Sequence, residues 1–486
     1  MLPIDRALLA IGEPSCGIKT HKLTLDSRAI APGTAFIAIK GHQLDGSRFI
    51  DNALAAGAAL VLVDSECQYQ PNRANVHVID GLANKLSLFA SAFYGEPSTQ
   101  FRLVGVTGTN GKSTVTSMIA NLASAPEQKT GVIGTLGWGQ TEKLTPLANT
   151  TPSAIDLQDL FWQMRDYELV AMEVSSHGLV QQRVAHSAFD IAVFTNLSRD
   201  HLDYHGTMLA YGEAKLSLLT NFSTKCNVVN FDDSQVKQWL AEGRIPNPVL
   251  FGENLPTDIS YPFVSFDNAK YSKQGLCCDI RSSWGSQKVT VPLFGKFNLY
   301  NLTAALATLL NLTYDFNWLI DKIDQLDAVV GRMQAFSADN KPTCIVDYAH
   351  TPDALEQALI ALSEHVGSNI TCVFGCGGDR DKGKRPLMAQ IAEKYANKVI
   401  VTNDNPRTED EKAITADILA GFAAAERAVV EHDRYQAIAH AIATTSADGI
   451  VLIAGKGHED YQIIGTNTLY FSDSLVAQQI LKGESA

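Results

Sequence analysis

The sequence predicts an α/β protein made of three domains. Short apolar runs that read as buried strands alternate with helix-like stretches along most of the chain. Its 486 residues are enough for about three domains of roughly 100–200 residues each. We place the boundaries after the Gly-Glu-Pro-Ser segment at 95–98 and after the Gly-Arg pair at 331–332. The expected domains are therefore residues 1–98, 99–332 and 333–486, the first being the smallest.

Composition and charge exclude several classes of protein. The formal net charge of −13 argues against a protein that binds nucleic acid or acidic membranes over a broad surface. Hydrophobic residues make up 45 % of the chain, enough for substantial cores, yet no run of 18 apolar residues occurs. We therefore expect no nucleic-acid partner and no membrane span. A monomer with small-molecule partners is a separate expectation, which composition does not establish.

The cysteines and the N-terminus indicate a cytoplasmic protein. Eight cysteines occur without any C-x-x-C pair, and no basic segment followed by a long apolar stretch opens the chain. A reducing compartment fits this pattern better than a disulfide framework does.

The first domain shows two strand-like runs, at residues 34–39 and 59–63, and two helix-like stretches, at 47–57 and 82–94. Two polar clusters, at 25–28 and 40–46, lie beside them. Taken alone, both clusters read as turns.

The most informative stretch is GVTGTNGKST, at residues 105–114. The apolar run 101–106 predicts a buried strand, and a helix is expected from Lys112 to residue 122. A glycine-rich turn between a strand and a Lys-Ser helix start is typical of sites that hold a nucleoside triphosphate with Mg²⁺. The common spacing needs Gly where Val106 stands, so an ordinary glycine-rich turn is the alternative.

Two later strands of this domain are expected to deliver polar groups to one sheet edge. The apolar run 169–174 leads into Ser175, Ser176 and His177, and the run 189–194 is followed by Asp200 and His201. Open α/β sheets bind ligands outside the carboxyl ends of their strands.

The third domain alternates strands and helices, which predicts a doubly wound parallel sheet with right-handed crossovers. Strands are expected at 343–347, 370–374, 398–402 and 450–454, with a helix at 353–362. The loop 375–378 is not G-x-G-x-x-G, so we expect no nicotinamide cofactor.

Together these motifs resemble the Mur ligase family of the Mur ligase and folylpolyglutamate synthase superfamily. The resemblance extends from the Asp-Ser-Arg at 26–28 to the Gly-Lys-Gly-His-Glu at 455–459, and it is greatest to members that add meso-2,6-diaminopimelate. It implies an N-terminal domain for the UDP end of the substrate, a central P-loop-type ATPase sheet and a C-terminal Rossmann-like domain. The implied enzyme is an ATP-dependent ligase that joins diaminopimelate to UDP-N-acetylmuramoyl-L-alanyl-D-glutamate through an acyl phosphate, in peptidoglycan precursor synthesis for cell-wall biogenesis, cell shape and cell division.

The resemblance also implies the residues that bind ATP. They comprise the glycine-rich loop, two later asparagines and two residues around the second domain boundary: Gly108, Thr109, Asn110, Gly111, Lys112, Ser113, Thr114, Asn298, Asn301, Arg332 and Asp347.

The implied catalytic residues are Lys112, Glu173, His201 and Lys215, and the implied Mg²⁺ ligands are Ser113, Glu173, His201 and Lys215. Lys215 would act as a carbamate formed with CO₂, because carbamylation turns a cation into an anionic oxygen ligand. Taken alone, Lys215 reads as a solvated helix lysine and Glu173 as a buried, hydrogen-bonded acid.

For the UDP-sugar dipeptide, the resemblance implies residues from the first two domains, whose amides, hydroxyls and arginine suit a diphosphate and two carboxylates. They are Leu25, Ser27, His42, Gln43, Leu44, Asn149, Thr150, Thr151, Ser175, Gln181 and Arg183.

For diaminopimelate, it implies Arg380, Asp404, Asn405, Pro406, Arg407, Gly455 and Glu459. Diaminopimelate carries one carboxylate more than lysine, and a bidentate arginine is the side chain suited to grip it. Arg407 is predicted to do so, and Glu459 to take an ammonium group. Taken alone, residues 404–407 read as a β-turn.

Three other functions remain open from the sequence. One is the addition of lysine or another step of the same pathway, although lysine-adding family members lack the arginine at 407. Another is folylpolyglutamate synthesis, which does not fit the 404–407 motif or the first domain. A binding or regulatory protein with a degenerate ligase fold is the alternative from another class. Against it, the residues at the predicted reacting centre are all present.

Overall fold

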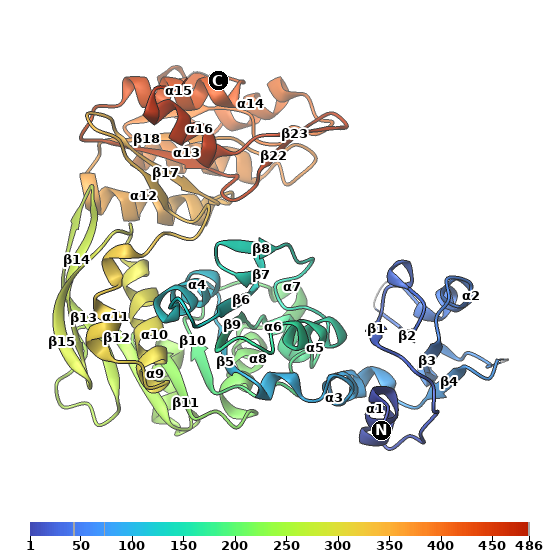
Figure 1. Cartoon of the computed structure of the whole chain (residues 1–486). Helices are drawn as coiled ribbons and strands as arrows, with labels where there is room; N and C mark the ends of the chain where they lie inside the picture. The colour runs from blue at the N-terminus through green and yellow to red at the C-terminus, as the bar shows by residue number, and fades with distance from the viewer. Residues whose placement is uncertain (42–43, 72, 485–486) are drawn as a thin grey trace. The chain divides into compact units, whose positions relative to one another are not determined.

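The computed structural model describes residues 1–41, 44–71 and 73–484 (Figure 1). The chain forms two compact units, Met1–Val264 with Ala304–Tyr314, and Ser265–Thr303 with Asp315–Ala486. Each unit contains parallel sheets covered by helices, which confirms the predicted α/β class. The boundaries at residues 98 and 332 remain predictions.

The first unit begins with a small parallel sheet of order β1-β2-β3-β4. Its strands are β1 (Lys22–Thr24), β2 (Thr34–Ala38), β3 (Leu60–Asp64) and β4 (Val76–Ile79), and its helices are α1 (Pro3–Ala10), α2 (Ile50–Ala55) and α3 (Leu82–Tyr94). Alternate strand residues pack on α1 and α3 on one face and on α2 on the other. The structure confirms β2, β3 and α3. The expected helix at 47–57 is instead a 3-10 turn, Gly46–Phe49, followed by α2, and the short β1 and β4 were not predicted.

A larger sheet follows in the same unit, with the strand order β12-β11-β10-β5-β9-β6-β7-β8. Its strands are β5 (Arg102–Thr107), β6 (Thr130–Gly134), β7 (Gly137–Gln140), β8 (Lys143–Thr145), β9 (Leu169–Glu173), β10 (Ile191–Phe194), β11 (Cys226–Asn230) and β12 (Pro248–Glu253). The strands from β12 to β6 are parallel, whereas β7 and β8 form an antiparallel extension. β5 therefore lies between β9 and β10, and the carboxyl ends of all three meet at one edge (Figure 1).

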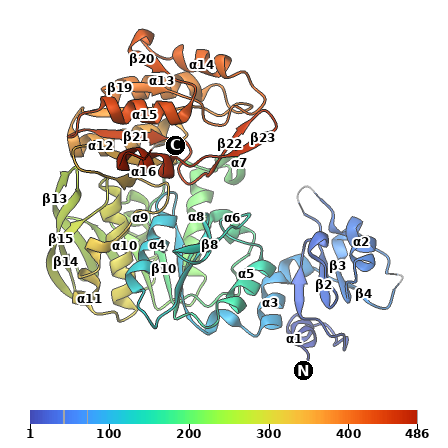
Figure 2. The same cartoon turned by 45° about the horizontal axis from the view of Figure 1, so that its top comes forward.

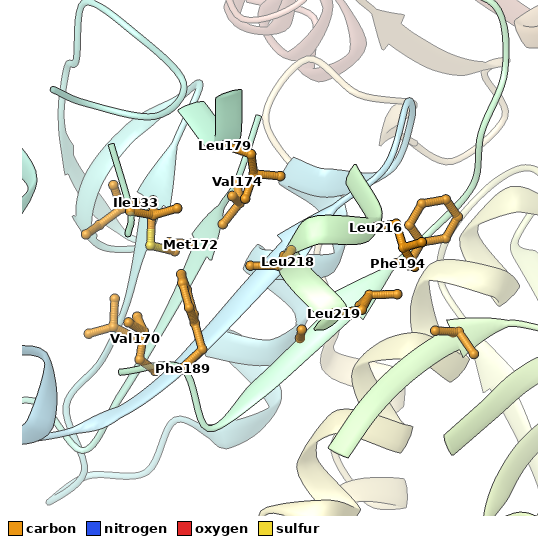
Figure 3. Close-up of a cluster of buried hydrophobic side chains, with 14 of the residues drawn as sticks. Ile133, Val170, Met172, Val174, Leu179, Phe189, Phe194, Leu216, Leu218 and Leu219 are labelled. Atoms are coloured by element: carbon orange, nitrogen blue, oxygen red, sulfur yellow. The ribbon is translucent and has the colours of Figure 1, made fainter. Parts of the chain in front are cut away.

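Helices cover both faces of this sheet. They are α4 (Lys112–Ala123), α5 (Ala154–Gln163), α6 (Ser176–Val180), α7 (Leu202–His205), α8 (Met208–Thr220) and α9 (Ser234–Ala241). The core on one face, drawn in Figure 3, includes Val170, Met172 and Phe194 of the strands and Leu216 and Leu219 of α8, with Leu216 beside Phe194. α4 contacts β9, β6 and β5. This packing fixes the strand ends from which the site is built.

The second unit contains a β-meander and a second parallel sheet. The meander comprises β13 (Phe263–Ser272), β14 (Gly275–Ser282) and β15 (Gly285–Val291), accompanied by α11 (Phe316–Ile320); α10 (Phe297–Asn311) contributes to both units. The second sheet has the order β16-β17-β21-β18-β19-β20, and only β16 is antiparallel to its neighbour. Its strands are β16 (Gln334–Phe336), β17 (Thr343–Asp347), β18 (Ile370–Phe374), β19 (Lys398–Val401), β20 (Ala428–Val430) and β21 (Ile450–Ala454).

Alternating strand residues of this sheet pack on two helical layers (Figure 2). α12 (Pro352–Val366), α13 (Lys384–Tyr395) and α14 (Glu411–Leu419) cover one face, and α15 (Arg434–Thr444) and α16 (Asp473–Lys482) cover the other. A hairpin of β22 (Tyr461–Ile464) and β23 (Asn467–Tyr470) is added near the end. The predicted doubly wound sheet is confirmed at β17, β18, β19 and β21, whereas β16, β20 and the hairpin were not predicted.

Two of the exclusions made from the sequence can be compared with the structure. All eight cysteines are free. In the described part of the chain, no helix is both long and apolar enough to cross a membrane.

His365 of α12 is a buried histidine held by two backbone groups of the second unit. Its Nε2 accepts a hydrogen bond from the Gly295 N–H at 3.0 Å, and its Nδ1 donates to the Ser272 carbonyl at 2.7 Å. The ring is therefore a neutral Nδ1-H tautomer. Burial lowers the pKa of His365 below its usual 6.5, and the Ser272 carbonyl opposes this in part.

We expect His365 to make the protein less stable in mild acid. As the pH falls below about 6.5, the unfolded chain takes up a proton at residue 365 that the folded chain resists, so the free energy of unfolding declines towards pH 5.5. Urea unfolding at pH 7.5 and 5.5 should show a smaller decline in His365→Gln than in the unmodified protein. The exposed His440→Gln serves as the control and should keep the original decline; equal declines in all three proteins would contradict the prediction.

Candidate active site

The glycine-rich loop between β5 and α4 is held in one conformation by the segment that follows β10. Gly108 has a φ of 143° and Gly111 a φ of 86°, values that favour glycine. A Cβ on Gly108 would overlap the Thr195 hydroxyl, which donates to the carbonyl of Asn110 at 2.6 Å. Because β10 is adjacent to β5, the two loops meet at the sheet edge.

Asn196 and Thr109 complete this attachment. The Asn196 side chain accepts from the Asn110 N–H at 2.9 Å, and its backbone carbonyl accepts from the Thr109 N–H at 2.9 Å. The Thr109 hydroxyl accepts from the Ser198 N–H at 3.0 Å. The loop is thus preorganised, with the N-terminus of α4 at its end, an arrangement that suits phosphate groups.

Replacing Gly108 by alanine is expected to abolish nucleotide binding. The added methyl group would displace either Thr195 or the loop itself, so we expect the affinity for ATP to fall by about 100-fold or more. Titration calorimetry with ATP measures this effect. Gly243→Ala is the matched control, because Gly243 also has a positive φ, 68°, but open space around its Cα; a similar loss in both variants would contradict the steric argument.

Two lysine side chains converge on the Gly108 carbonyl. Lys112 Nζ donates to it at 3.0 Å and to the Thr109 carbonyl at 2.9 Å. Lys215 Nζ, from α8, donates to the same Gly108 oxygen at 2.7 Å. A positively charged group and an amine thus face the loop from two elements.

Lys215 is buried, so the alternative of a solvated helix lysine is wrong. The residue is 1 % exposed, and its Nζ lies 4.6 Å from the centre of the Tyr211 ring. Burial and, next, the Lys112 charge lower the pKa of Lys215 from 10.5 to about 6, whereas the Asp200 charge opposes the shift. At neutral pH this side chain is an uncharged, nucleophilic amine.

Glu173 lies at the end of β9, directly beside β5, and is 2 % exposed. Its carboxylate accepts from the Thr135 N–H at 2.9 Å and from the Thr135 hydroxyl at 3.2 Å. A Cβ on Gly134 would overlap it. Glu173 is therefore a buried, hydrogen-bonded acid, which was one of the two roles expected from the sequence. Because it lies at the end of β9, next to the end of β5, it is also near the glycine-rich loop.

His201 is about half exposed and sits in a left-handed conformation with a φ of 51°. Its Nε2 lies 3.4 Å from the Asp200 carboxylate, and its ring centre lies 5.0 Å from that of His177 and 6.1 Å from that of Tyr211. His201 and Lys215 are thus both neighbours of Tyr211.

Five of the residues expected to bind the dipeptide form one hydrogen-bonded group. Arg183 donates to the Thr151 carbonyl at 2.6 Å and to the Gln181 side chain at 2.6 and 3.0 Å. Thr151 donates to the Glu173 carbonyl and accepts from the Ser175 N–H, each at 2.9 Å. Thr150 reaches this region through its 3.0 Å contact with Thr135. Asn149 precedes Thr150 in the same exposed loop.

The residues expected in the N-terminal sheet region are not joined to that group. Leu25 follows β1, Ser27 opens a 3-10 turn, and Leu44 is 62 % exposed. Within residues 1–41, 44–71 and 73–484, no hydrogen bond links these three to the Arg183 group. His42 and Gln43 lie outside the described residues.

The remaining nucleotide residues belong to the second unit. Asn298 and Asn301 are buried at the start of α10, where Asn301 donates to Asn298 at 3.1 Å. Asp347 ends β17 and accepts from the Met333 and Ala349 N–H groups at 2.8 and 2.9 Å. Burial raises the pKa of Asp347, although these two bonds and the Arg332 charge oppose the shift. The Arg332 guanidinium lies 4.9 Å from the centre of the Tyr348 ring.

The predicted amino-acid residues gather at the carboxyl edge of the second sheet. A Cβ on Gly377 would lie 2.9 Å from Nη1 of Arg407 and 3.6 Å from Cγ of Arg380, so both arginines flank this glycine. Arg407 also pairs with Ile464 in an isolated parallel bridge, so residues 404–407 are more than a simple turn. Both arginines thus start from the same place, and a guanidinium group is suited to grip a carboxylate.

The other members of this group surround a buried lysine. Asn405 donates to the Glu459 carboxylate at 2.9 Å, and Lys456 Nζ lies 3.3 Å from that carboxylate and 3.4 Å from the Asn405 side-chain oxygen. Gly455 has a φ of 116°, and a Cβ there would lie 2.9 Å from the Asp404 carboxylate. Pro406 is buried between Asn405 and Arg407. The structure therefore brings all seven predicted residues together.

Sequence reasoning missed several supporting residues. Thr195 and Asn196 follow β10 directly, so their place at a strand end was an available signal. Lys456 lies inside the Gly-Lys-Gly-His-Glu motif itself. Thr135 gave no signal, because its contact with Glu173 depends on the pairing of β6 with β9.

A clamped phosphate-type loop beside a buried amine and a buried carboxylate defines a nucleotide-dependent α/β enzyme. Three family models match the chain: "Mur ligase family, catalytic domain" at residues 19–94, "Mur ligase middle domain" at 106–309, and "Mur ligase, glutamate ligase domain" at 331–457. The chain belongs to the Mur ligase family.

Individual relatives agree with this assignment. UDP-N-acetylmuramoyl-L-alanyl-D-glutamate--2,6-diaminopimelate ligase of Haemophilus influenzae (strain PittGG) is 44 % identical over 485 residues, which cover 98 % of this chain and 99 % of that protein. A solved structure of a UDP-N-acetylmuramoyl-L-alanyl-D-glutamate--2,6-diaminopimelate ligase is 36 % identical with a TM-score of 0.71, covering 97 % of this chain and 96 % of that one. The MurF ligase of Thermotoga maritima in complex with ADP shares the fold, with a TM-score of 0.64 at 20 % identity, over 90 % of this chain and 94 % of that one.

Proposed function

We propose that this protein is an ATP-dependent ligase that adds meso-2,6-diaminopimelate to UDP-N-acetylmuramoyl-L-alanyl-D-glutamate in peptidoglycan precursor synthesis. The near full-length identity to ligases of that name supports the activity. The single observation that carries the choice of amino acid is the pair of arginines beside Gly377, because a lysine substrate would leave these two cations without a carboxylate.

ATP binds with its phosphates on the loop from Gly108 to Thr114. Backbone N–H groups of the loop and of the α4 N-terminus face the phosphate oxygens. Lys112 leaves the carbonyls of Gly108 and Thr109 and neutralises the β and γ charges, which favours phosphoryl transfer between two anions. Asn298, Asn301, Arg332 and Asp347 serve the nucleoside end and the phosphates.

Mg²⁺ fits the donor set of this region. Ser113, Glu173 and His201 offer the oxygen and nitrogen ligands, and the Glu173 oxygens retain lone pairs beyond their bonds to Thr135. Among the described residues, no three His, Cys, Asp or Glu side chains gather closely enough to hold a metal by themselves. A carbamate on Lys215 supplies the missing anionic oxygens. The ion, when bound, stabilises the charge that develops on the transferred phosphate.

The Lys215 environment supports that carbamate. The uncharged amine attacks the carbon of CO₂, a new N–C bond forms, and the nitrogen loses one proton. The low pKa of the amine allows this at neutral pH, since only the unprotonated form has a free electron pair.

The dipeptide lies between the group around Arg183 and the N-terminal sheet region. Arg183, Gln181, Thr150, Thr151 and Ser175 hold its carboxylates and diphosphate, together with Asn149. Leu25, Ser27, His42, Gln43 and Leu44 serve the UDP end. The terminal carboxylate oxygen attacks the γ-phosphorus, ADP departs, and an acyl phosphate forms.

The amine of diaminopimelate then completes the reaction. Arg380 and Arg407 grip the distal carboxylate, and Glu459 with Asp404 receives the distal ammonium. The free amine attacks the acyl carbon, loses a proton, and expels phosphate as the amide forms. Asn405, Pro406 and Gly455 shape the walls of this pocket.

The proposed function also assigns one substrate to each of three domains. The domains are residues 1–98 for the UDP-sugar, 99–332 for ATP and 333–486 for the amino acid. The enzyme acts as a cytoplasmic monomer.

One assay tests this function. The protein is incubated with ATP, Mg²⁺, the UDP-muramyl dipeptide and a single amino acid, and phosphate release is measured. We expect release with meso-diaminopimelate and far less with L-lysine. Release with L-lysine alone would reverse the specificity, and no release with any amino acid would favour a binding protein with a ligase fold.

A further inference from the structure

Two loops of the second unit carry the arginines of the proposed diaminopimelate pocket. Residues 375–381 follow β18 and include Arg380, and residues 402–409 follow β19 and include Arg407. β18 and β19 are parallel neighbours, so both loops emerge at the same edge of the sheet. Because loops can move independently of the strands they follow, further contacts are needed to hold Arg380 and Arg407 in fixed relative positions.

The loops are first joined by their backbones. The Gly378 N–H donates to the Asn405 carbonyl at 2.9 Å, and Arg407 Nη1 donates to the Gly378 carbonyl at 3.0 Å. A Cβ on Gly378 would overlap the Pro406 carbonyl, so this close approach requires glycine.

Two residues at this junction are held in an unfavourable backbone conformation. Asp379 has a φ of 54° and Arg407 a φ of 52°, in the left-handed region that costs a residue with a side chain about 1 kcal/mol or more. The Asp379 carboxylate accepts from the Thr408 N–H at 3.1 Å and from its hydroxyl at 2.8 Å. Each strained residue is thus tied to the loop of the other.

An ion pair joins Glu409, the last residue of the second loop, to Arg385 of α13, and the proposed reaction does not use it. Glu409 accepts from the Asp379 N–H at 2.9 Å, and its two oxygens also accept from Arg385 at 2.9 and 2.8 Å. Arg385 is 0 % exposed and donates further to the Asp417 carboxylate at 2.8 Å and to the Gly377 carbonyl at 3.1 Å. Lys382 adds a second cation, 2.9 Å from Glu409.

We propose that Glu409 and Arg385 are positioning residues that hold the Asp379–Arg380 backbone against Arg407, and thereby set the specificity for an amino acid with a distal carboxylate. Glu409 fixes the Asp379 N–H, one peptide before Arg380, and Arg385 fixes both Glu409 and the Gly377 carbonyl. The inference rests on the proposed function, because it assigns these residues to the diaminopimelate pocket of that reaction.

The geometry explains why a direct contact with substrate is not needed. A bidentate grip needs a guanidinium within a few tenths of an ångström of its position. Arg407 Nη1 already bonds to the Gly378 carbonyl, and Gly378 is the residue before Asp379. A shift of the Asp379 peptide therefore moves both arginines.

Glu409→Gln tests this arrangement, since glutamine keeps the shape and can still accept from the Asp379 N–H but loses the ion pair. We expect the KM for diaminopimelate to rise about tenfold, with kcat and the KM for ATP changed less than about twofold. The preference for diaminopimelate over L-lysine should fall in parallel. Thr408→Val is an exposed and nearly isosteric change that removes the hydroxyl bound to Asp379, and it should raise the same KM about threefold. This second variant tests the inference if Glu409→Gln fails to fold.

The matched control is Asp267→Asn. Asp267 accepts from Arg281 at 3.1 Å on the β13–β14 hairpin of the same unit, and its side chain is 19 % exposed against 12 % for Glu409. This control should leave all kinetic constants unchanged. An unchanged KM for diaminopimelate in folded Glu409→Gln, or an equal rise in the KM for ATP, would overturn the inference alone. Absence of diaminopimelate-dependent turnover in the unmodified protein would overturn the proposed function as well.

Discussion

Lys215→Met is expected to lower kcat about 1000-fold or more and to make the protein more stable. Methionine has a similar length and no amine, so no carbamate can form and the anionic oxygens of the proposed metal site are lost. Phosphate release with all three substrates measures the effect on activity. In the unmodified enzyme, removal of dissolved CO₂ should reduce the rate and bicarbonate should restore it, whereas the variant should not respond.

The gain in stability follows from the pKa of the buried amine. Near pH 7 the unfolded Lys215 binds a proton that the folded residue, with a pKa of about 6, does not bind. Burying this amine therefore opposes folding, and its removal should raise the free energy of unfolding by about 1–3 kcal/mol at pH 7 in CO₂-free buffer. The loss of the hydrogen bond to Gly108 keeps the gain below the full value of the pKa shift.

The pH dependence of the stability gain in Lys215→Met shows whether the uncharged amine is its cause. Between pH 6 and 10.5 the stability of the unmodified protein rises with pH, because its unfolded form gradually loses the extra proton. The advantage of Lys215→Met should therefore shrink by about 1.4 kcal/mol for each pH unit. Urea unfolding at pH 7 and 9 measures this. An advantage that grows with pH would show that Lys215 is charged in the folded protein.

Arg407→Ala should raise the KM for diaminopimelate about 10–150-fold, the range expected for losing charge-assisted hydrogen bonds of roughly 1.5–3 kcal/mol. The KM for ATP should not change, since the loop that holds ATP belongs to a different sheet. Arg407→Lys should recover only part of the loss, because an ammonium group cannot match both carboxylate oxygens. Steady-state kinetics with each substrate varied in turn measures these effects.

The exposed Arg427 of the same unit provides the control for charge. Arg427→Ala removes one cation far along the chain from the loops and should leave both KM values unaltered. If Arg407→Ala raised the KM for ATP as much as that for diaminopimelate, Arg407 would not belong to the amino-acid pocket. Comparable rates with L-lysine and diaminopimelate in the unmodified protein would also contradict the assigned role.

The strands of the two main sheets were predictable because they are buried on both faces. The runs that became β5, β9, β18 and β21 are nearly continuous apolar segments, as parallel strands between helix layers must be. The short strand β1 and the β22–β23 hairpin carry mixed polar residues, so their pattern does not differ from that of loops. β20 is apolar but has only three residues, two of them exposed, which is too short a run to indicate a strand. Their formation depends on neighbours distant in sequence.

The residues proposed to bind substrates could be predicted from the sequence, but the residues that hold them in position could not. Lys112, Glu173 and Arg407 stand in motifs at strand ends, where the residue type already suggests a ligand. The burial of Lys215 could not be predicted, because α8 carries no motif that sets how deep its lysine lies. Arg385 and Glu409 likewise look like solvated charges, and only the folded chain brings them together.

The position of β5 between β9 and β10 has a consequence for how the nucleotide loop comes into being. A chain ending before residue 191 contains the whole glycine-rich motif but neither β10 nor Thr195 and Asn196, so the motif has nothing to clamp it. The loop can therefore take its final form only after roughly two hundred residues have been made, Thr195 and Asn196 among them. In the finished protein, β5 amides are covered by a strand on each side and should exchange with solvent deuterium among the slowest in the chain. The nucleotide loop thus begins at the end of a strand that is expected to open rarely.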